Sequence, residues 1–170
     1  MRLFAALQPS PEFREELSKL QQRLRAAGIG GRYLDPVNLH LTLAFIGEWP
    51  QNVTEYLPAV GTPFPIALSH IGVFQRAKVL WAGIEPSQRL NDLAALVRKN
   101  LRDAGIPYDP QDFNPHITLI RKPVLPEEEL LNEIKPMPAA MMVQEICLYQ
   151  SEHTENGMAY TVIGRKKGTA

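Results

Sequence analysis

A His-x-Thr motif occurs twice in this chain, and its repetition restricts the folds that the sequence can adopt. The first copy lies in residues 38–43 and the second in residues 114–119, 76 positions later. Alternate side chains of a β-strand point to opposite faces, so the His and the Thr of each copy share one face. In the first copy, Leu41, Leu43 and Phe45 are then expected on the opposite, core-facing side. The sequence predicts two strands that each present an imidazole and a hydroxyl.

The similarity between the two parts of the chain extends beyond the motif. Residues 3–6 resemble residues 80–83, and residues 24–29 resemble residues 101–106, each 77 positions later. Three anchors in the same order at nearly one spacing indicate a duplicated unit. Each unit is predicted to contain a strand, a helix ended by a glycine, a loop and a His-x-Thr strand.

Duplicated units usually pack about a pseudo-twofold axis, which brings equivalent residues together. His40 and His116 are therefore expected in one cleft. The alternative is two unrelated core histidines, each satisfied by a backbone carbonyl. The equivalent positions, with Thr42 and Thr118 on the same faces, favour a shared site.

The predicted fold class is α+β, a bilobal duplicated unit with two mostly antiparallel sheets, outer helices and a central cleft that carries the two His-x-Thr strands. Residues 1–170 are expected to form a single bilobal domain. The units span roughly residues 1–48 and 78–123, and residues 62–78 and 140–164 complete the strands of the two lobes.

Local signals predict the individual elements. A helix begins at Ser10 and Pro11, an N-cap followed by proline at the first position, and ends at Gly28. A second helix is expected over 86–104. Asn156 and Gly157 indicate a hairpin turn. We further expect a hairpin over 63–84, a strand over 141–151, short helices over 53–60 and 126–134, and a frayed tail over 165–170.

Composition excludes several classes of protein. Lys plus Arg and Asp plus Glu number 18 each, and this zero net charge disfavours a protein that grips long duplex nucleic acid, but not recognition of one terminal phosphate. The single cysteine, Cys147, excludes an internal disulfide and a cysteine-rich zinc site, and it is expected to be buried. Neither a signal-peptide pattern nor a membrane-spanning apolar run is found, so a cytoplasmic protein is expected without a membrane partner.

Two facing imidazoles are suited to paired general base and general acid catalysis near neutral pH. The hydroxyls of Thr42 and Thr118 can bind the oxygens of a phosphate held between them. The guanidinium of Arg121 also fits a phosphate. Strict alternation places Arg121 on the face opposite His116 and Thr118, unless a bend before Pro123 returns it to their face. Spacing alone therefore allows a phosphate ligand and an ordinary surface residue equally. The reaction that suits this site is opening of a cyclic phosphodiester by in-line attack, without a metal or other cofactor.

Other chemistries lack support. A metal site built from His40 and His116 alone has no carboxylate or thiolate ligand at a suitable spacing. The sequence contains no nucleophile elbow and no phosphate-binding glycine-rich loop. The repeat aligns Phe4 with Trp81, so either could stack on a base or pack in the core. The remaining histidines, His70 and His153, are interpreted as ordinary loop or strand residues.

The paired motif on a duplicated α+β unit resembles the two-histidine phosphoesterase superfamily. Within it, residues 2–6, 38–43, 114–121 and 148–151 resemble the bacterial and archaeal RNA 2′,3′-cyclic phosphodiesterases, also called 2′-5′ RNA ligases. The resemblance implies a protein that acts on RNA with a 2′,3′-cyclic phosphate end, or on a small cyclic nucleotide, and leaves a 2′-phosphate. A monomer is expected, although the sequence does not determine the oligomeric state.

The resemblance also assigns roles to residues. It implies His40 as the proton donor and His116 as the proton acceptor, although a near-symmetric site also allows the reverse. Thr42, Thr118 and Arg121 would bind the phosphate, and Phe4 would contact a base. The alternatives are joining of tRNA halves through a 2′-5′ bond, hydrolysis of another small cyclic phosphodiester, and a non-catalytic module that binds RNA ends. The two histidines argue against the binding module, because binding alone does not need two titratable groups.

Overall fold

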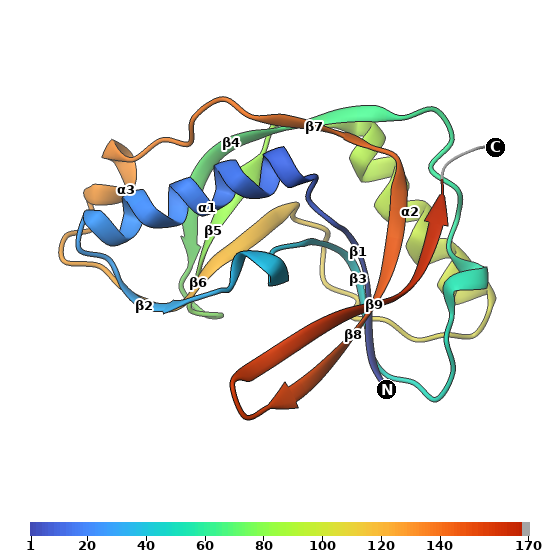
Figure 1. Cartoon of the computed structure of the whole chain (residues 1–170). Coiled ribbons are helices and arrows are strands. Elements are labelled where there is room, and N and C mark those ends of the chain that lie inside the picture. The colour runs from blue at the N-terminus through green and yellow to red at the C-terminus, as the bar shows by residue number, and fades with distance from the viewer. Residues whose placement is uncertain (168–170) are drawn as a thin grey trace.

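A computed structural model describes residues 1–167, and it places the described strands in one curled, mostly antiparallel sheet (Figure 1). The strand order is β7-β4-β5-β6-β3-β1-β8-β9, with β2 paired on β6. The strands are β1 (Arg2–Leu7), β2 (Gly30–Tyr33), β3 (Leu41–Glu48), β4 (Phe64–Phe74), β5 (Val79–Ile84), β6 (His116–Val124), β7 (Ala140–Val143), β8 (Glu145–Thr154) and β9 (Gly157–Lys167). The helices are α1 (Pro11–Ala26), α2 (Gln88–Asp103) and α3 (Leu130–Glu133), with 3₁₀ turns η1 (Pro36–Asn38) and η2 (Thr54–Tyr56).

The sheet has the symmetry that the sequence repeat predicts. β1 pairs with β3 in one half, and β5 pairs with β6 in the other. β8 and β9 extend the first half, as β4 and β7 extend the second. The halves meet at β3 and β6 through the single residue pair Leu41 and Ile117. The α+β class and the antiparallel pairing are confirmed, but the two expected sheets are one sheet with a narrow join.

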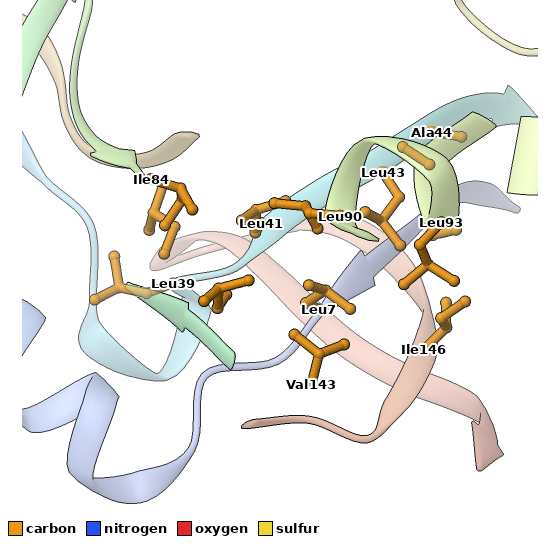
Figure 2. Close-up of a cluster of buried hydrophobic side chains, with 14 of the residues drawn as sticks. Leu7, Leu39, Leu41, Leu43, Ala44, Ile84, Leu90, Leu93, Val143 and Ile146 are labelled. Carbon is orange, nitrogen blue, oxygen red and sulfur yellow. The ribbon is translucent and has the colours of Figure 1, made fainter. Parts of the chain in front are cut away.

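Each long helix covers the sheet of the other half. α1 follows β1 yet contacts β6, and α2 follows β5 yet contacts β3. Figure 1 shows the two helices at opposite ends of the molecule. Leu90 and Leu93 of α2 belong to the same buried cluster as Leu41 and Leu43 of β3 (Figure 2). The two units therefore exchange their helices across the join.

The two long helices form where the sequence predicts them because their ends are capped. The hydroxyl of Ser10 accepts a hydrogen bond from the Phe13 amide at 3.2 Å, and the hydroxyl of Ser87 accepts one from the Leu90 amide at 3.1 Å. Gly28 follows α1 with a φ of +89°, which glycine adopts without steric cost. The observed bounds lie within two residues of the expected ones.

Several elements differ from the predictions. The strand expected over 141–151 is two strands, because β7 pairs with β4 and β8 pairs with β1. β2 was expected to be a loop. The helix expected over 53–60 is only the turn η2, and α3 is shorter than 126–134. Arg165–Lys167 lie in β9 and not in a frayed tail; the rest of that predicted tail, 168–170, lies outside the described residues.

Candidate active site

The two His-x-Thr segments meet at the join between the halves. β3 and β6 run antiparallel, and the aliphatic residues that follow the two histidines pair with each other. One residue to either side, this register places His40 opposite Thr118 and Thr42 opposite His116 on one face of the sheet. The imidazoles thus lie at diagonal corners of a square, and diagonal neighbours in a sheet are about 7–8 Å apart. The two remaining corners carry the hydroxyls.

Backbone carbonyls orient both imidazoles in the same way. The Nδ1 atom of His40 lies 2.7 Å from the Asn38 carbonyl oxygen, and that of His116 lies 2.6 Å from the Asn114 carbonyl oxygen. A carbonyl oxygen only accepts, so each Nδ1 carries the hydrogen. The Nε2 atom of each ring is then the one left to exchange protons with a bound molecule.

The surroundings lower the affinity of both imidazoles for protons. Burial lowers the pKa of His40 from 6.5 to about 4, against the opposing effect of the Asn38 carbonyl, and the positive charges of Arg121 and His116 lower it further. Burial also lowers the pKa of His116, again opposed by its carbonyl partner. The charge of His116 thus contributes to the lowered pKa of His40, which indicates that the two imidazoles lie near each other.

Aromatic rings hold the imidazole of His40 from several sides. Its ring centroid lies 4.7 Å from that of Phe4, 5.2 Å from that of Tyr160 and 5.7 Å from that of Tyr149. Phe4 is only 3% exposed and stacks on Tyr149 at 4.9 Å. Phe4 thus packs behind His40, and its predicted contact with a base stays a prediction.

The second imidazole has an aromatic wall of different composition. The centroid of the His116 ring lies 5.0 Å from that of Phe74 and 6.4 Å from that of Trp81. Trp81 pairs with Thr118 in the sheet, whereas Ala6 occupies that place beside the first motif. In the strand register, Trp81 is therefore equivalent to Ala6 and not to Phe4, with which the sequence repeat aligns it.

A β-bulge follows each motif and changes which side chains face the cleft. Leu43 is skipped in the pairing of β3 with β1, and Leu119 is skipped in the pairing of β6 with β5. Each skipped residue reverses the alternation of the strand. Phe45, expected on the core side, consequently lines the cleft, and so does Arg121. Arg121 arrives through this bulge and not through a bend before Pro123.

Side chains from the exchanged helices bind the carbonyl groups of the two bulged residues. Gln21 Nε2 of α1 donates to the Leu119 carbonyl oxygen at 3.0 Å, and Arg98 Nε of α2 donates to the Leu43 carbonyl oxygen at 3.2 Å. Gln21 and Arg98 are 77 positions apart, as the repeat requires. The Leu119 carbonyl oxygen also accepts a hydrogen bond from the Leu34 amide at 3.0 Å, so Gln21 adds a second donor to the carbonyl of this bulge.

A hollow of about 410 Å³ lies over this face. Because the sheet is curled, β9 reaches β6 across it, and Arg121 Nη2 donates to the Tyr160 hydroxyl at 3.3 Å. His116 is not part of its wall but shares the face of β6 with Thr118. The wall is formed by Arg2, Phe4, Arg32, His40, Thr42, Phe45, Thr118, Arg121, Ser151, His153, Met158 and Tyr160.

Sequence reasoning missed several of these wall residues. His153 was interpreted as an ordinary histidine, yet it lines the hollow together with Ser151 of the same strand. The Ser151 hydroxyl is buried, and it forms no hydrogen bond with another described residue. The alternation of Tyr149, Ser151 and His153 along one strand was the available signal, because residues two apart share a face.

Three further findings concern the described residues. Within residues 1–167, no group of three or more His, Cys, Asp or Glu side chains is arranged to hold a metal ion. No helix in this range is long and apolar enough to cross a membrane. Cys147 is buried as expected, and burial raises the pKa of its thiol to about 11.

Comparison with known proteins gives a consistent set of relatives. Residues 9–155 match the 2′-5′ RNA ligase superfamily. An RNA 2′,3′-cyclic phosphodiesterase of Thermotoga maritima is 30% identical over 96% of this chain and 93% of the relative. One from Escherichia coli K12 is 30% identical over 96% of this chain and 94% of the relative.

The fold agrees with these sequence matches. A crystal structure of E. coli LigT complexed with 3′-AMP superposes with a TM-score of 0.79 at 28% identity, covering 99% of this chain and 98% of that chain. The match extends over both halves of the sheet and both exchanged helices. On these findings, the chain belongs to the 2′-5′ RNA ligase superfamily.

Proposed function

We propose that this protein is an RNA 2′,3′-cyclic phosphodiesterase that hydrolyses a terminal 2′,3′-cyclic phosphate to a 2′-phosphate. The observation that carries the proposal is the pair of equivalently oriented imidazoles, each with Nδ1 bound to a carbonyl and Nε2 free, at diagonal corners around two threonine hydroxyls. A site for binding alone needs no second proton-transfer group. The relatives named as RNA 2′,3′-cyclic phosphodiesterases support the same activity.

In the proposed reaction, one imidazole removes a proton from water as the water oxygen attacks phosphorus. The bond between phosphorus and the ribose 3′ oxygen breaks, and the second imidazole gives its proton to that oxygen. Following the family resemblance, His116 is the base and His40 the acid. Thr42, Thr118 and Arg121 hold the phosphoryl oxygens, where their hydrogen bonds stabilise the charge that develops.

The proton affinity of the free protein does not favour His40 as the acid. Burial lowers the pKa of His40 to about 4, and the positive charges of Arg121 and His116 contribute to this shift, so protonation of His40 is disfavoured near neutral pH. A bound phosphodiester anion stabilises whichever imidazolium it contacts and raises the pKa of that group. The position of the leaving oxygen in the complex therefore decides which histidine is the acid.

The test uses an RNA oligonucleotide that ends in a 2′,3′-cyclic phosphate, in the presence of EDTA. We expect the protein to form a 2′-phosphate end, and the variants His40→Ala and His116→Ala to lose roughly 10²–10⁴-fold in rate, the usual contribution of a general acid or base. His70→Ala is the matched control, because the His70 ring packs on Trp81 at 5.3 Å and not on either of the two imidazoles. Turnover at the normal rate by either alanine variant, or activity lost in EDTA and restored by a divalent ion, would contradict the mechanism.

A second substrate assigns the two roles. A 3′-deoxynucleoside 2′-(p-nitrophenyl phosphate) has no neighbouring hydroxyl that could attack phosphorus, so water must be the nucleophile. Its leaving group departs without protonation, so it needs the base but not the acid. His40→Ala should hydrolyse it at nearly the normal rate, whereas His116→Ala should not. The reverse result would exchange the two roles and leave the activity intact.

The superfamily description favours one further activity. If the 5′-hydroxyl of a second RNA replaces water as the nucleophile, the same steps join two RNA ends through a 2′-5′ phosphodiester and free the 3′-hydroxyl. Incubation of a cyclic-phosphate RNA with a 5′-hydroxyl RNA should give a joined product that a 3′-5′-specific nuclease does not cleave at the junction. If only hydrolysis occurs with both ends present, this second activity is absent.

A further inference from the structure

Two arginines lie side by side at one end of the hollow, and only one of them has a role in the reaction. Arg32 of β2 and Arg121 of β6 are direct cross-strand partners. Like charges in this arrangement destabilise a sheet. Among residues 1–167, neither arginine forms an ion pair. The sheet therefore holds two neighbouring guanidinium groups that no described carboxylate neutralises.

The backbone of β2 is built to bring Arg32 to this place. Gly31 has a φ of +122°, and a Cβ atom there would lie 2.8 Å from the Ile120 side chain and from the Lys122 carbonyl oxygen. Only glycine allows β2 to approach β6 this closely. In the second unit, within the described residues, the segment between α2 and β6 forms no corresponding strand. β2 therefore adds one arginine to one side of the site only.

A second hollow of about 210 Å³ continues from the first at these arginines. Both hollows are lined by Arg32, Arg121, Met158 and Tyr160, so the two spaces adjoin along this wall. Asp35 is the acid in the wall of the second hollow, and its carboxylate accepts a hydrogen bond from the Val37 amide at 3.0 Å. That carboxylate caps η1 and makes no ion pair with Arg32.

We propose that Arg32 binds the 5′-phosphate of the terminal nucleotide and that the second hollow receives the nucleotide that precedes it. This inference rests on the proposed function. The terminal nucleotide of an RNA chain carries two phosphates, the reacting cyclic phosphate and the 5′-phosphate that joins it to the rest. Arg121, beside Thr118, serves the first, and Arg32, one strand farther from the histidines, serves the second. The preferred substrate is then an oligonucleotide end, and not a free cyclic nucleoside phosphate.

The test compares adenosine 2′,3′-cyclic phosphate with the same molecule carrying a 5′-phosphate and with the dinucleotide ApA 2′,3′-cyclic phosphate. We expect the 5′-phosphate to raise kcat/KM roughly tenfold to a hundredfold, as a charge-assisted hydrogen bond does. In Arg32→Gln this advantage should disappear, while turnover of the unphosphorylated substrate stays normal. Arg102→Gln is the matched control, because it removes a positive charge from the outer surface of α2.

Two kinetic results would overturn the proposal while leaving the proposed function intact. One is an equal rate loss for all three substrates in Arg32→Gln, which would mean that Arg32 supports the site generally. The other is an unchanged preference for the 5′-phosphate in that variant.

A binding measurement separates this inference from the proposed function. Calorimetry with adenosine 2′-monophosphate and adenosine 2′,5′-bisphosphate needs no turnover. We expect the unmodified protein to bind the bisphosphate more tightly than the monophosphate. Arg32→Gln should bind the two ligands with equal affinity, within error. If no substrate is hydrolysed but this pattern is seen, the proposed function fails and the 5′-phosphate site stands. Equal affinity of both ligands for the unmodified protein overturns the site.

Discussion

At the scale of single residues, each histidine of the proposed mechanism is fixed by one backbone carbonyl and by the rings around it. The carbonyls of Asn38 and Asn114 determine which nitrogen carries the hydrogen. The rings exclude water and so depress the affinity of both imidazoles for protons. The carbonyls therefore fix the orientation of each ring, and they partly oppose the effect of burial on its pKa.

The lowered pKa values predict the pH dependence of the reaction. Catalysis needs one neutral and one protonated imidazole, and both pKa values of the empty cleft lie below 6.5. As pH rises above that value, the singly protonated form disappears and kcat/KM falls; at low pH, both rings are protonated and it falls again. We therefore expect a bell-shaped kcat/KM profile centred below pH 6.5.

The profile of kcat should differ, because it reports the complex. A bound phosphodiester anion raises the pKa of the imidazole beside it, so the kcat maximum should lie at a higher pH than that of kcat/KM. Measurement of both parameters over pH 4–9 with a cyclic dinucleotide checks this. A kcat/KM optimum above pH 7 would contradict the effect of burial on the free protein.

At the scale of elements, the bulges at Leu43 and Leu119 determine what the strands present. Beyond its bulge, β6 turns Arg121 to the hollow, and α1 supports that bulge through the Gln21 side chain. Gln21 is 6% exposed, and its Nε2 atom also donates to the Leu34 carbonyl oxygen at 2.9 Å, so it links the bulge to the segment that follows β2. The position of Arg121 thus depends on a residue of the other unit.

This dependence predicts a coupling between Gln21 and Arg121. Gln21→Met removes the donor but keeps the length, so it should lower kcat/KM by misplacing the guanidinium. In the background of Arg121→Gln, the same change should have little further effect, because the group it positions is already absent. A double-mutant cycle at a temperature well below the melting of every variant measures the coupling. Strictly additive losses would show that Gln21 acts only on stability.

Arg98 provides the matched control for this cycle. It binds the other bulge, beyond which β3 presents Phe45. Arg98→Met should therefore show no coupling to Arg121→Gln, although it disturbs an equivalent hydrogen bond. Coupling of similar size in both cycles would indicate a general loosening of the sheet.

The elements also show which parts of the structure were predictable from the sequence. Helix ends and hairpins were predicted because capping and turn signals are local. The bulges were not, because leucine carries no bulge signal, and simple alternation therefore misplaced Phe45. The equivalent apolar pairs Leu43-Ala44 and Leu119-Ile120 were the overlooked evidence, since two adjacent buried residues break the period of a strand.

The presence of β2 and the separation of β7 from β8 could not be inferred from the sequence, for a different reason. Gly30 and Gly31 favour a loop, and β2 exists only because β6 offers an edge in the other unit. Likewise, β7 and β8 are separate because their partners lie in different halves of the sheet. Such pairings depend on the assembled molecule and leave little trace in the local sequence.

At the scale of the whole molecule, the exchange of helices makes the two units interdependent. α1 covers β6, α2 covers β3, and β8 lies beside β1 although most of the chain separates them. Each half of the sheet is therefore incomplete until the other has been synthesised. Contacts of this range are slow to form, because distant segments must first be brought together.

Division of the chain after Gly61, in the segment between η2 and β4, tests this interdependence. We expect the fragments 1–61 and 62–170, prepared separately, to lack cooperative thermal unfolding, because each exposes the surface that the other covers. Mixed together, they should recover the circular dichroism of the intact chain. If fragment 62–170 alone melts cooperatively, its half of the molecule does not need α1.

The exchanged helices also bear on the origin of the fold. A protein of one unit would have a helix without a sheet to cover and a bulge carbonyl without a donor. Two copies would satisfy each other as a symmetric dimer, in which each subunit contributed one histidine. Such a dimer has identical sides, whereas the fused chain carries Phe45 on one side and Arg121 on the other. Fusion thus permits unequal sides, as a reaction with one entering and one departing oxygen requires.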